Sequence, residues 1–440
     1  MKDKPLPPGS YGLPFIGETI GWVRDPEAWV RAHLQRYGSI FKTRVLGRRV
    51  VVMLGPRANR FILWSHSEHF QWGGGYGAFV GGLFPGSLSM EDGKLHRRHR
   101  DLLAPWFRGK AVEGYYPIVN ERVQARIRQW SEKDEITAFD ECRRLTLDMV
   151  ARALIGPAAE GQTDRLALDF ETLSRGLLTP FKWDLPWMAY GRALRARRRL
   201  EAWISGAIQR ARESEGDNLL TSLVQGQEEA TSRLAEAEMV PHILGLLFDG
   251  QDTTGSLMTW LLLELERHPQ VLQRLREEVG NGVGAEGAGW EEIAGFKYLD
   301  AVVQEIGRLH HPAPALPRMV VKEFEFDGYR VPEGSLVLYS PAASHRMPEA
   351  FERPEEFDPE RFLPPREEHR REPFGLVTFG GGPRSCLGAP LALMELKVLA
   401  VALAQGYDWS AAPGQDLRPR FFATKRPRSG LRLRVQKGVG

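Results

Sequence analysis

The sequence predicts a mainly α-helical fold with small β-sheets. Helical patterns run almost unbroken from Lys94 to Leu309. Strand patterns are short and lie near the N-terminus and at the C-terminal end. The chain of 440 residues is long for one core, but no Pro/Gly/Ser-rich linker, repeat or low-complexity tract divides it. We therefore expect one large unit rather than two domains.

Composition excludes several classes of protein. The 59 basic and 56 acidic residues leave a net charge of +3, which is not typical of a nucleic-acid-binding protein. Two cysteines exclude a disulfide scaffold and suit a reducing compartment. The first nine residues lack the apolar core of a signal peptide, and no later stretch has eighteen uncharged apolar residues. We expect a soluble cytoplasmic protein without a membrane anchor.

The N-terminal elements have clear start and stop signals. Asp25 before Pro26 predicts a helix start, with Asp as the N-cap, and Gly38 predicts its end. Residues 40–45 and 49–54 flank a turn at Gly47 and predict a β-hairpin. Residues 56–64 predict a short helix.

Residues 71–90 contain seven glycines and four aromatic residues. We expect a loop here, because so many glycines disfavour regular structure. A long loop in a compact domain is usually functional or mobile. Its aromatic residues Trp72, Tyr76, Phe79 and Phe84 suit one wall of an apolar pocket.

A long apolar helix is interrupted by polar residues. Residues 244–248 and 257–265 are apolar on all sides, which predicts a buried helix. The polar segment 249–255 lies between them, and buried polar groups are costly unless they are paired or functional. Thr253 can donate to the carbonyl four residues back and open the helix locally, with Gly250 leaving room for a small ligand. The alternative is a water-filled kink.

The second cysteine, Cys386, lies in a glycine-rich loop, residues 379–388, just before a helical pattern. At that junction the thiol meets the positive end of a helix dipole and free backbone N–H groups, which lower a thiol pKa. The glycines allow a flat, bulky group to approach the backbone. The alternative is a buried, inert cysteine. Cys142 has no comparable loop.

Several other groups are ambiguous when taken singly. His96 and Arg100 share a helix face, but Arg97, Arg98 and His99 between them also fit a solvated basic helix. Glu305 and Arg308 are spaced like an ordinary surface pair. Near the C-terminus, residues 418–424 and 431–435 predict a β pair whose turn could reach into a pocket.

Taken together, these motifs resemble the cytochrome P450 family. Residues 379–388 read Phe-x-x-Gly-x-Arg-x-Cys-x-Gly, which is similar at every fixed position to the family's haem-binding loop. Gly250, Asp252, Thr253 and Thr254 match its central helix, whereas Asp249 replaces the usual Ala or Gly. The resemblance implies the P450 fold, a triangular prism, as a single haem domain over residues 1–440. It implies β-rich parts at about 38–70 and 315–345.

The resemblance also implies roles for individual residues. Cys386 would be the axial ligand of the iron of haem b, in a loop with Phe379 and Arg384. His96, Arg100 and Arg318 would bind the haem propionates. Asp252 and Thr253 would hold water and relay the protons that oxygen activation consumes. Glu305, Arg308 and Arg361 would form a buried folding lock beneath the haem.

The implied activity is monooxygenation: insertion of one oxygen atom from O2 into a C–H bond. The N-terminal third is similar to the retinoic-acid hydroxylases of vertebrates and their cyanobacterial relatives. The expected substrate is a terpenoid, retinoid, steroid or fatty-acid-like molecule. The expected pocket walls are apolar, with Asp249 among them: Trp72, Phe79, Phe84, Leu177, Phe181, Leu244, Phe248, Ala315, Leu316, Phe422 and Ala423.

No reductase segment follows the cysteine loop, so we expect a separate ferredoxin-type electron donor with its own reductase. It would dock on Lys94, Arg97, Arg98 and the side of Arg384, although these charges also fit simple solubility. The protein is expected to be a monomer. One alternative is an enzyme that uses peroxide or rearranges a hydroperoxide; another is a haem sensor or carrier. The Asp252–Thr253 pair argues against both, since neither needs a proton relay.

Overall fold

The computed structural model describes residues 4–177, 179, 182–213, 218–225, 234–282 and 288–438. Helices make up most of the fold, and short 3-10 turns connect several of them. The α-helices are α1 Thr19–Arg24, α2 Pro26–Tyr37, α3 Pro56–Arg60, α4 Trp72–Val80, α5 Gly93–Leu103, α6 Lys110–Ser131, α7 Ala138–Ile155, α8 Thr163–Leu177, α9 Ala189–Ala211, α10 Leu219–Gln225, α11 Glu236–Arg267, α12 Pro269–Gly282, α13 Trp290–Gly295, α14 Lys297–Leu309, α15 Pro341–Ser344 and α16 Ala389–Gly406.

The strands form small sheets. The largest has the order β1-β2-β8-β5-β3, and the others are β4-β12-β9, β6-β7 and β10-β11. The strands are β1 Ile40–Val45, β2 Arg48–Met53, β3 Phe70–Gln71, β4 Ile136–Thr137, β5 Leu316–Val320, β6 Phe324–Phe326, β7 Tyr329–Val331, β8 Leu336–Tyr339, β9 Tyr407–Ala411, β10 Pro419–Phe422, β11 Thr424–Pro427 and β12 Arg432–Lys437. The prediction of a mainly helical fold with small sheets is confirmed.

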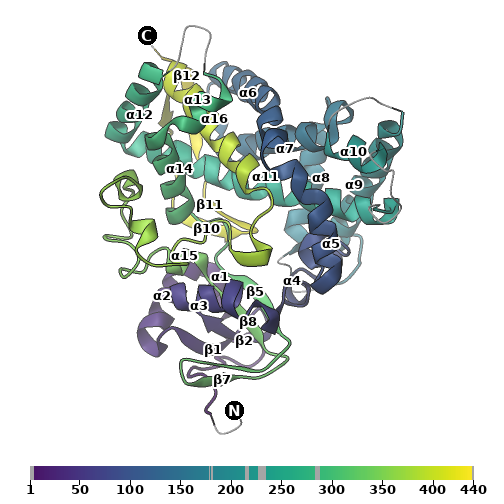
Figure 1. The fold of residues 1–440 in the computed structure, drawn as a ribbon, viewed down its shortest axis with the longest axis vertical. Coiled ribbons are helices and arrows are strands. Elements are labelled where there is room, and N and C mark those ends of the chain that lie inside the picture. Colours follow the sequence, from purple (N-terminus) through teal and green to yellow (C-terminus); the bar gives the residue numbers. More distant parts are fainter. Residues whose placement is uncertain are drawn as a thin grey trace.

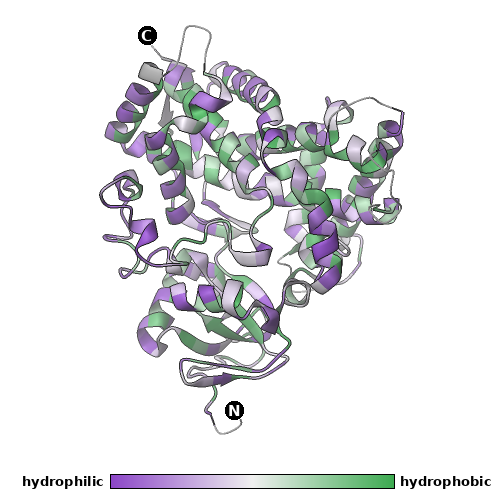
Figure 2. Cartoon of the chain, viewed as in Figure 1, coloured by the Kyte–Doolittle hydropathy of each residue, from purple (hydrophilic) through white to green (hydrophobic). Residues whose placement is uncertain are grey.

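The five-stranded sheet lies at the N-terminal end of the molecule, and α11 runs through the middle of the helical part (Figure 1). α11 packs against α7, α9 and α16. Its surroundings form the main hydrophobic core, and a separate cluster lies on each face of the five-stranded sheet. Outer helices such as α5 and α12 are largely hydrophilic (Figure 2). A buried α11 is what its apolar sequence predicts.

The first elements form as their local signals predict. The Asp25 carboxylate accepts a hydrogen bond from the N–H of Ala28 and caps α2. Gly38, with φ of 85°, ends the helix. β1 and β2 pair antiparallel from Ile40 opposite Met53 to Val45 opposite Arg48, so the predicted hairpin is confirmed. These elements depend on contacts between residues close in sequence.

The prediction of a loop at residues 71–90 is wrong, because the helix α4 occupies the first half of this segment. Its glycines permit close packing: a Cβ on Gly75 would lie 2.7 Å from the Cα of Arg318, and one on Gly73 would lie 2.1 Å from the carbonyl oxygen of Met90. The Asp92 carboxylate accepts hydrogen bonds from the N–H groups of Trp72 and Gly73. α4 is therefore capped by a residue far along the chain, and its glycines place it against β5.

The expected pairing of residues 418–424 with 431–435 is also wrong. β10 pairs with β11 around Ala423, whereas β12 pairs with β9 and β4. Ala423 has a φ of 60°, in the left-handed region that a tight reversal requires. The hairpin is thus much shorter than expected.

Among the described residues, α16 is the one helix long and apolar enough to cross a membrane by composition. It lies largely inside the molecule and contributes Leu391, Met394 and Leu399 to the main core.

Candidate functional site

Cys386 lies three residues before α16, at the end of a tightly folded loop. Its N–H donates to the carbonyl of Phe379 at 2.8 Å, which closes the loop. Gly380 and Gly382 have φ values of 71° and 64°, which favour glycine. A Cβ on Gly382 would lie 2.0 Å from the carbonyl oxygen of Leu63, so a larger residue cannot fit there.

Desolvation by the surrounding protein raises the pKa of the Cys386 thiol to about 11, although the residue is exposed. Hydrogen bonds from the backbone N–H groups of Gly388 and Ala389 act in the opposite direction, as does the charge of Arg100. The donors at the helix start act in the expected direction, but the expected net lowering of the thiol pKa is wrong, because desolvation outweighs the donors. A metal ion bound to the sulfur removes the proton outright.

Three arginines and a histidine converge near this cysteine. Arg100 donates to the Ser385 carbonyl at 2.7 Å. Burial lowers the pKa of Arg384 to about 10, and the positive charges of Arg318 and Arg100 contribute to this shift. Burial, then Arg384 and Arg100, lowers the pKa of His96 to about 3. This mutual repulsion makes the cluster a strong site for a ligand with negative charges.

Trp72 belongs to this cationic cluster rather than to an apolar wall. The guanidinium of Arg318 lies 3.3 Å from the centre of its ring, and that of Arg384 lies 5.5 Å away. Asp92 also reaches the cluster, accepting from Arg384 at 2.8 Å. Stacking and this hydrogen bond hold the arginines in place.

These residues fit a haem. Cys386 and, on α11, Asp249 and Thr253 are exposed, although the surrounding protein raises the pKa values of Cys386 and Asp249; we call the space that these three residues border the cavity. Cys386 could supply a thiolate ligand for the iron, Arg100, Arg318 and Arg384 could supply the positive charges that two propionates require, and His96 could supply a neutral hydrogen-bonding group. Phe379 is half-buried in the same loop.

α11 presents two polar residues to the same cavity. Asp249 and Thr253 are exposed, whereas Asp252 and Thr254 are buried. The Thr253 hydroxyl donates to the carbonyl of Asp249 at 2.6 Å. α11 continues unbroken through this segment. One helix face therefore offers a carboxyl and a hydroxyl to whatever the cavity binds.

Desolvation by the surrounding protein, then the charge of Asp252, raises the pKa of Asp249 to about 7. Its charge in turn raises the pKa values of Cys386 and of Tyr76 on α4. Asp249 thus acts on groups from two other elements that border the cavity.

Asp252 points away from Thr253 toward α7 and α8. Arg143 Nε donates to Asp252 Oδ1 at 2.5 Å, and the Ser174 hydroxyl donates to Oδ2 at 3.2 Å. Sequence reasoning missed both partners. No local signal singled out Arg143, because residues 138–155 contain several other charged residues.

Gly250 does not leave room for a ligand, as the sequence suggested. A Cβ on this residue would lie 3.2 Å from Cγ2 of Val150. Gly250 therefore faces α7 and permits the two helices to approach closely.

The expected apolar pocket residues fall into separate groups. The rings of Phe84 and Phe248 lie 4.6 Å apart, and Phe170, which was not expected, lies 6.4 Å from Phe248. Phe79 and Ala315 pack against the hydrophobic cluster on one face of the five-stranded sheet. Leu316 packs against the cluster on the other face. Leu177 and Leu244 are buried in the main core, and Ala423 packs against it. Phe181 and the side chain of Phe422 lie outside the described part of the chain.

Glu305, Arg308 and Arg361 are completely buried and in contact. Arg308 donates two hydrogen bonds to the Glu305 carboxylate, at 2.6 and 2.8 Å, and Arg361 donates a third at 3.0 Å. Glu368, which sequence reasoning missed, accepts from Arg361 at 2.8 Å. Two carboxylates and two guanidinium groups therefore balance inside the protein, as buried charges require.

The chain is similar to known proteins over nearly its whole length. The family model described as Cytochrome P450 matches residues 7–432. Cytochrome P450 120 of Synechocystis sp. is 33% identical over 440 residues, covering 99% of this chain and 98% of that protein. Cytochrome P450 26B1 of Danio rerio is 34% identical over 447 residues, covering 98% and 86%. A solved structure described as retinoic acid bound cyanobacterial CYP120A1 has a TM-score of 0.92 at 32% identity, covering 99% of this chain and 100% of that one.

Proposed function

The chain belongs to the cytochrome P450 family and is a haem-dependent monooxygenase, and from that premise we propose that it hydroxylates an elongated apolar molecule of the retinoid type. One observation carries the proposal: Cys386 is exposed near Asp249 of α11, whose charge acts on the Cys386 thiol, and Thr253 is exposed one turn further along the same helix. The retinoid class is supported by the similarity to a structure described as retinoic acid bound.

The cofactor is haem b in this proposal, held by Cys386 and by the cluster of Arg100, Arg318, Arg384 and His96. Haem supplies the chemistry of O2 activation, which the protein's side chains lack. The Cys386 thiolate would hold the iron and supply electron density to it, which favours cleavage of the O–O bond. The four cationic or polar groups neutralise the propionates and fix the orientation of the ring.

Thr253 and Asp252 are the proton-handling residues of the proposal. Thr253 Oγ1 already donates to the Asp249 carbonyl, so it can accept a hydrogen bond from a water in the cavity. Asp252 is held by Arg143 and Ser174, and so lies beside the cavity without entering it. It can take part in proton delivery only when one of these contacts opens.

Asp249 is the residue that selects the substrate end nearest the reacting carbon. With a pKa near 7 it can donate or accept a hydrogen bond. A donor group on the substrate close to the oxidised carbon would pair with its ionised form. A carboxylate at the other end of a retinoid acid would be kept away from the iron, because two carboxylates repel each other.

Electrons come from a ferredoxin-type protein and its reductase in this proposal. Lys94, Arg97 and Arg98 are exposed on α5, on the side away from the buried His96. Arg98 also lies 3.8 Å from Glu238. An acidic partner would be drawn to this face. We further propose that the enzyme is a cytoplasmic monomer and that residues 1–440 form one haem domain.

The first test is a ligand screen on the haem-loaded enzyme, read by the change in haem spin state. All-trans retinoic acid is compared with retinol, a steroid and a fatty acid of similar length. Hydroxylated product should then form only with O2, NADPH, a ferredoxin and its reductase. A product formed equally well with hydrogen peroxide alone would favour peroxide use, and a spin shift with steroids only would remove the retinoid assignment.

A further inference from the structure

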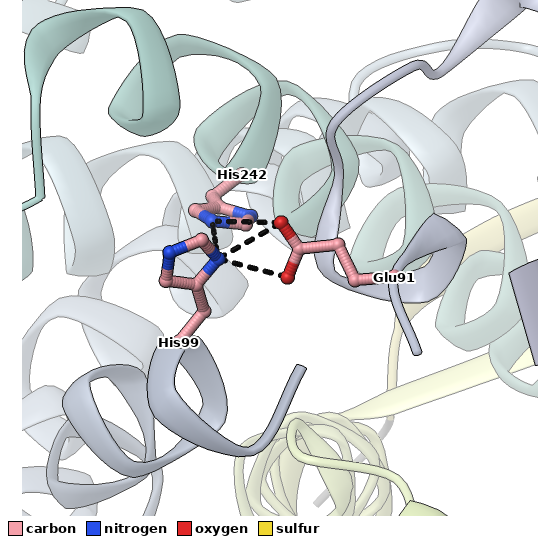
Figure 3. A group of neighbouring side chains, drawn as sticks. All are labelled: Glu91, His99 and His242. Atoms are coloured by element: carbon pink, nitrogen blue, oxygen red, sulfur yellow. Dashed lines mark hydrogen bonds and ion pairs between the residues drawn. The ribbon is translucent and has the colours of Figure 1, made fainter. Parts of the chain in front are cut away.

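A buried cluster outside the haem cavity joins α5 to α11. His99 on α5, His242 on α11 and Glu91, just before α5, turn their polar atoms toward one point (Figure 3). The exposed fractions are 1% for each histidine and 8% for Glu91. His99 Nδ1 lies 2.8 Å from Glu91 Oε1 and 3.0 Å from His242 Nε2, and His242 Nε2 lies 3.9 Å from Glu91 Oε1.

Hydrogen bonds alone satisfy this arrangement poorly. If His99 Nδ1 carries the proton, it donates to Glu91 and cannot also accept from His242. If it does not, its lone pair faces the carboxylate at 2.8 Å. The other ring nitrogens, His99 Nε2 and His242 Nδ1, have no hydrogen-bond partner among the described residues. Three atoms that carry lone pairs, His99 Nδ1, Glu91 Oε1 and His242 Nε2, therefore converge, and a single proton between them can form only one good hydrogen bond.

The three atoms are spaced as ligands of one small cation. A triangle with sides of 2.8, 3.0 and 3.9 Å has a point about 2.0 Å from every corner. Zinc binds imidazole nitrogen and carboxylate oxygen at about 2.0–2.2 Å.

Glu238, on the first turn of α11, supplies an outer carboxylate. Its Oε1 lies 3.5 Å from His99 Nε2, while its Oε2 accepts from the N–H of Ala235. No hydrogen bond forms at this distance, but histidines that bind metals usually direct their second N–H to a nearby carboxylate. Two carboxylates and one dication also leave no net charge in a buried place.

We propose that Glu91, His99 and His242 bind one divalent zinc-type cation, with Glu238 orienting His99. A water or the second oxygen of Glu91 completes the coordination. The ion is structural: it fastens α5, which carries His96 and Arg100, to the start of α11. Because Arg384 donates to the carbonyl of Glu91, the same segment is tied to the cationic cluster.

The test uses the haem-loaded enzyme, stripped with a chelator and titrated with ZnCl2 in competition with a chromophoric chelator. In that enzyme Cys386 is occupied by the iron. We expect one zinc per chain, two imidazole nitrogens at about 2.0–2.1 Å in zinc-edge X-ray absorption, and no sulfur. Zinc should also raise the Tm of the wild-type enzyme.

Three variants and one control locate the ion. His242→Ala and Glu91→Gln should weaken zinc binding by about 100-fold or more, and Glu238→Gln by about 10–100-fold. His66→Ala, a half-buried histidine outside the cluster, should bind as the wild type does. Absence of stoichiometric zinc in the wild type, or unchanged binding in His242→Ala and Glu91→Gln, overturns the proposal. If these variants do not fold, the X-ray absorption of the wild type decides alone.

Discussion

Arg143 Nε donates to Asp252 Oδ1 at 2.5 Å and joins α7 to α11 beside the haem cavity. The contact is buried, with both residues less than a tenth exposed. It directs the Asp252 carboxylate toward α7, whereas Thr253, the next residue, is exposed to the cavity. In the proposed function, proton delivery therefore depends on an ion pair that also holds two helices together.

Replacement of Thr253 by alanine should uncouple the enzyme. Thr253→Ala should keep ligand binding and haem content but divert reductant into hydrogen peroxide or water, because a group used only in the transition state lowers turnover without weakening binding. Thr253→Ser should restore coupling. Thr259→Ala is the matched control, since Thr259 also donates to the carbonyl four residues back but is buried. Product per NADPH consumed is the measurement, and equal ratios in Thr253→Ala and wild type would make the residue structural.

Loss of Arg143 should destabilise the protein by about 3–5 kcal/mol, because it leaves a buried carboxylate without its partner. Adding Asp252→Asn to Arg143→Met should recover part of this loss, since the unpaired charge is then removed. Chemical denaturation of the single and double variants gives the coupling energy. Additive effects would mean that the two side chains do not interact in solution.

Cys386→Ala should abolish the absorption band typical of a thiolate-bound haem in the reduced, CO-treated protein. Cys142→Ala is the control, because Cys142 is buried in the main core and burial raises its pKa to about 12. A thiolate-type band that survives in Cys386→Ala would require another ligand for the iron.

Glu305→Ala should give little soluble, haem-loaded protein. It leaves Arg308 and Arg361 without their shared carboxylate, at a cost of about 3–5 kcal/mol, a large part of a domain's net stability. Glu171→Ala removes the partner of Arg175 in an exposed pair and should cost less than about 1 kcal/mol. Yield, haem content and Tm of the two variants are compared; normal values for Glu305→Ala would make this group energetically unimportant.

Asp249 should make ligand binding depend on pH. Its pKa is raised to about 7 in the folded protein, so the folded state binds its proton more tightly than the unfolded chain does. The associated stabilisation is complete below about pH 4 and is lost as the pH rises through about 7. Binding of an apolar ligand should weaken over the same rise, because the ligand must then desolvate a charge.

The measurement is the dissociation constant from the spin-state shift between pH 5.5 and 8.5. Asp249→Asn should flatten the pH profile, and Asp249→Ala should also change the ratio of hydroxylated products. If both variants keep the wild-type profile and product ratio, Asp249 takes no part in substrate choice.

The sequence by itself determined the features that rest on neighbouring residues. The Asp25 cap, the hairpin of β1 and β2 and the apolar α11 follow from local hydrogen bonds and periodicity. The cysteine loop is of the same kind, because the Phe379–Cys386 hydrogen bond and the glycines with positive φ lie within a few residues.

Only the tertiary structure decided what depends on distant partners or on burial. α4 forms where its glycines predicted a loop, because Asp92 caps its first turn and because the glycines, which lack side chains, allow its backbone to pack closely against β5. Asp252 finds Arg143 across more than a hundred residues, and His242 finds His99 in the same way. The thiol pKa of Cys386 rises although its helix end should lower it, because desolvation depends on everything packed around the sulfur. Such terms are set by the whole fold, and no local pattern contains them.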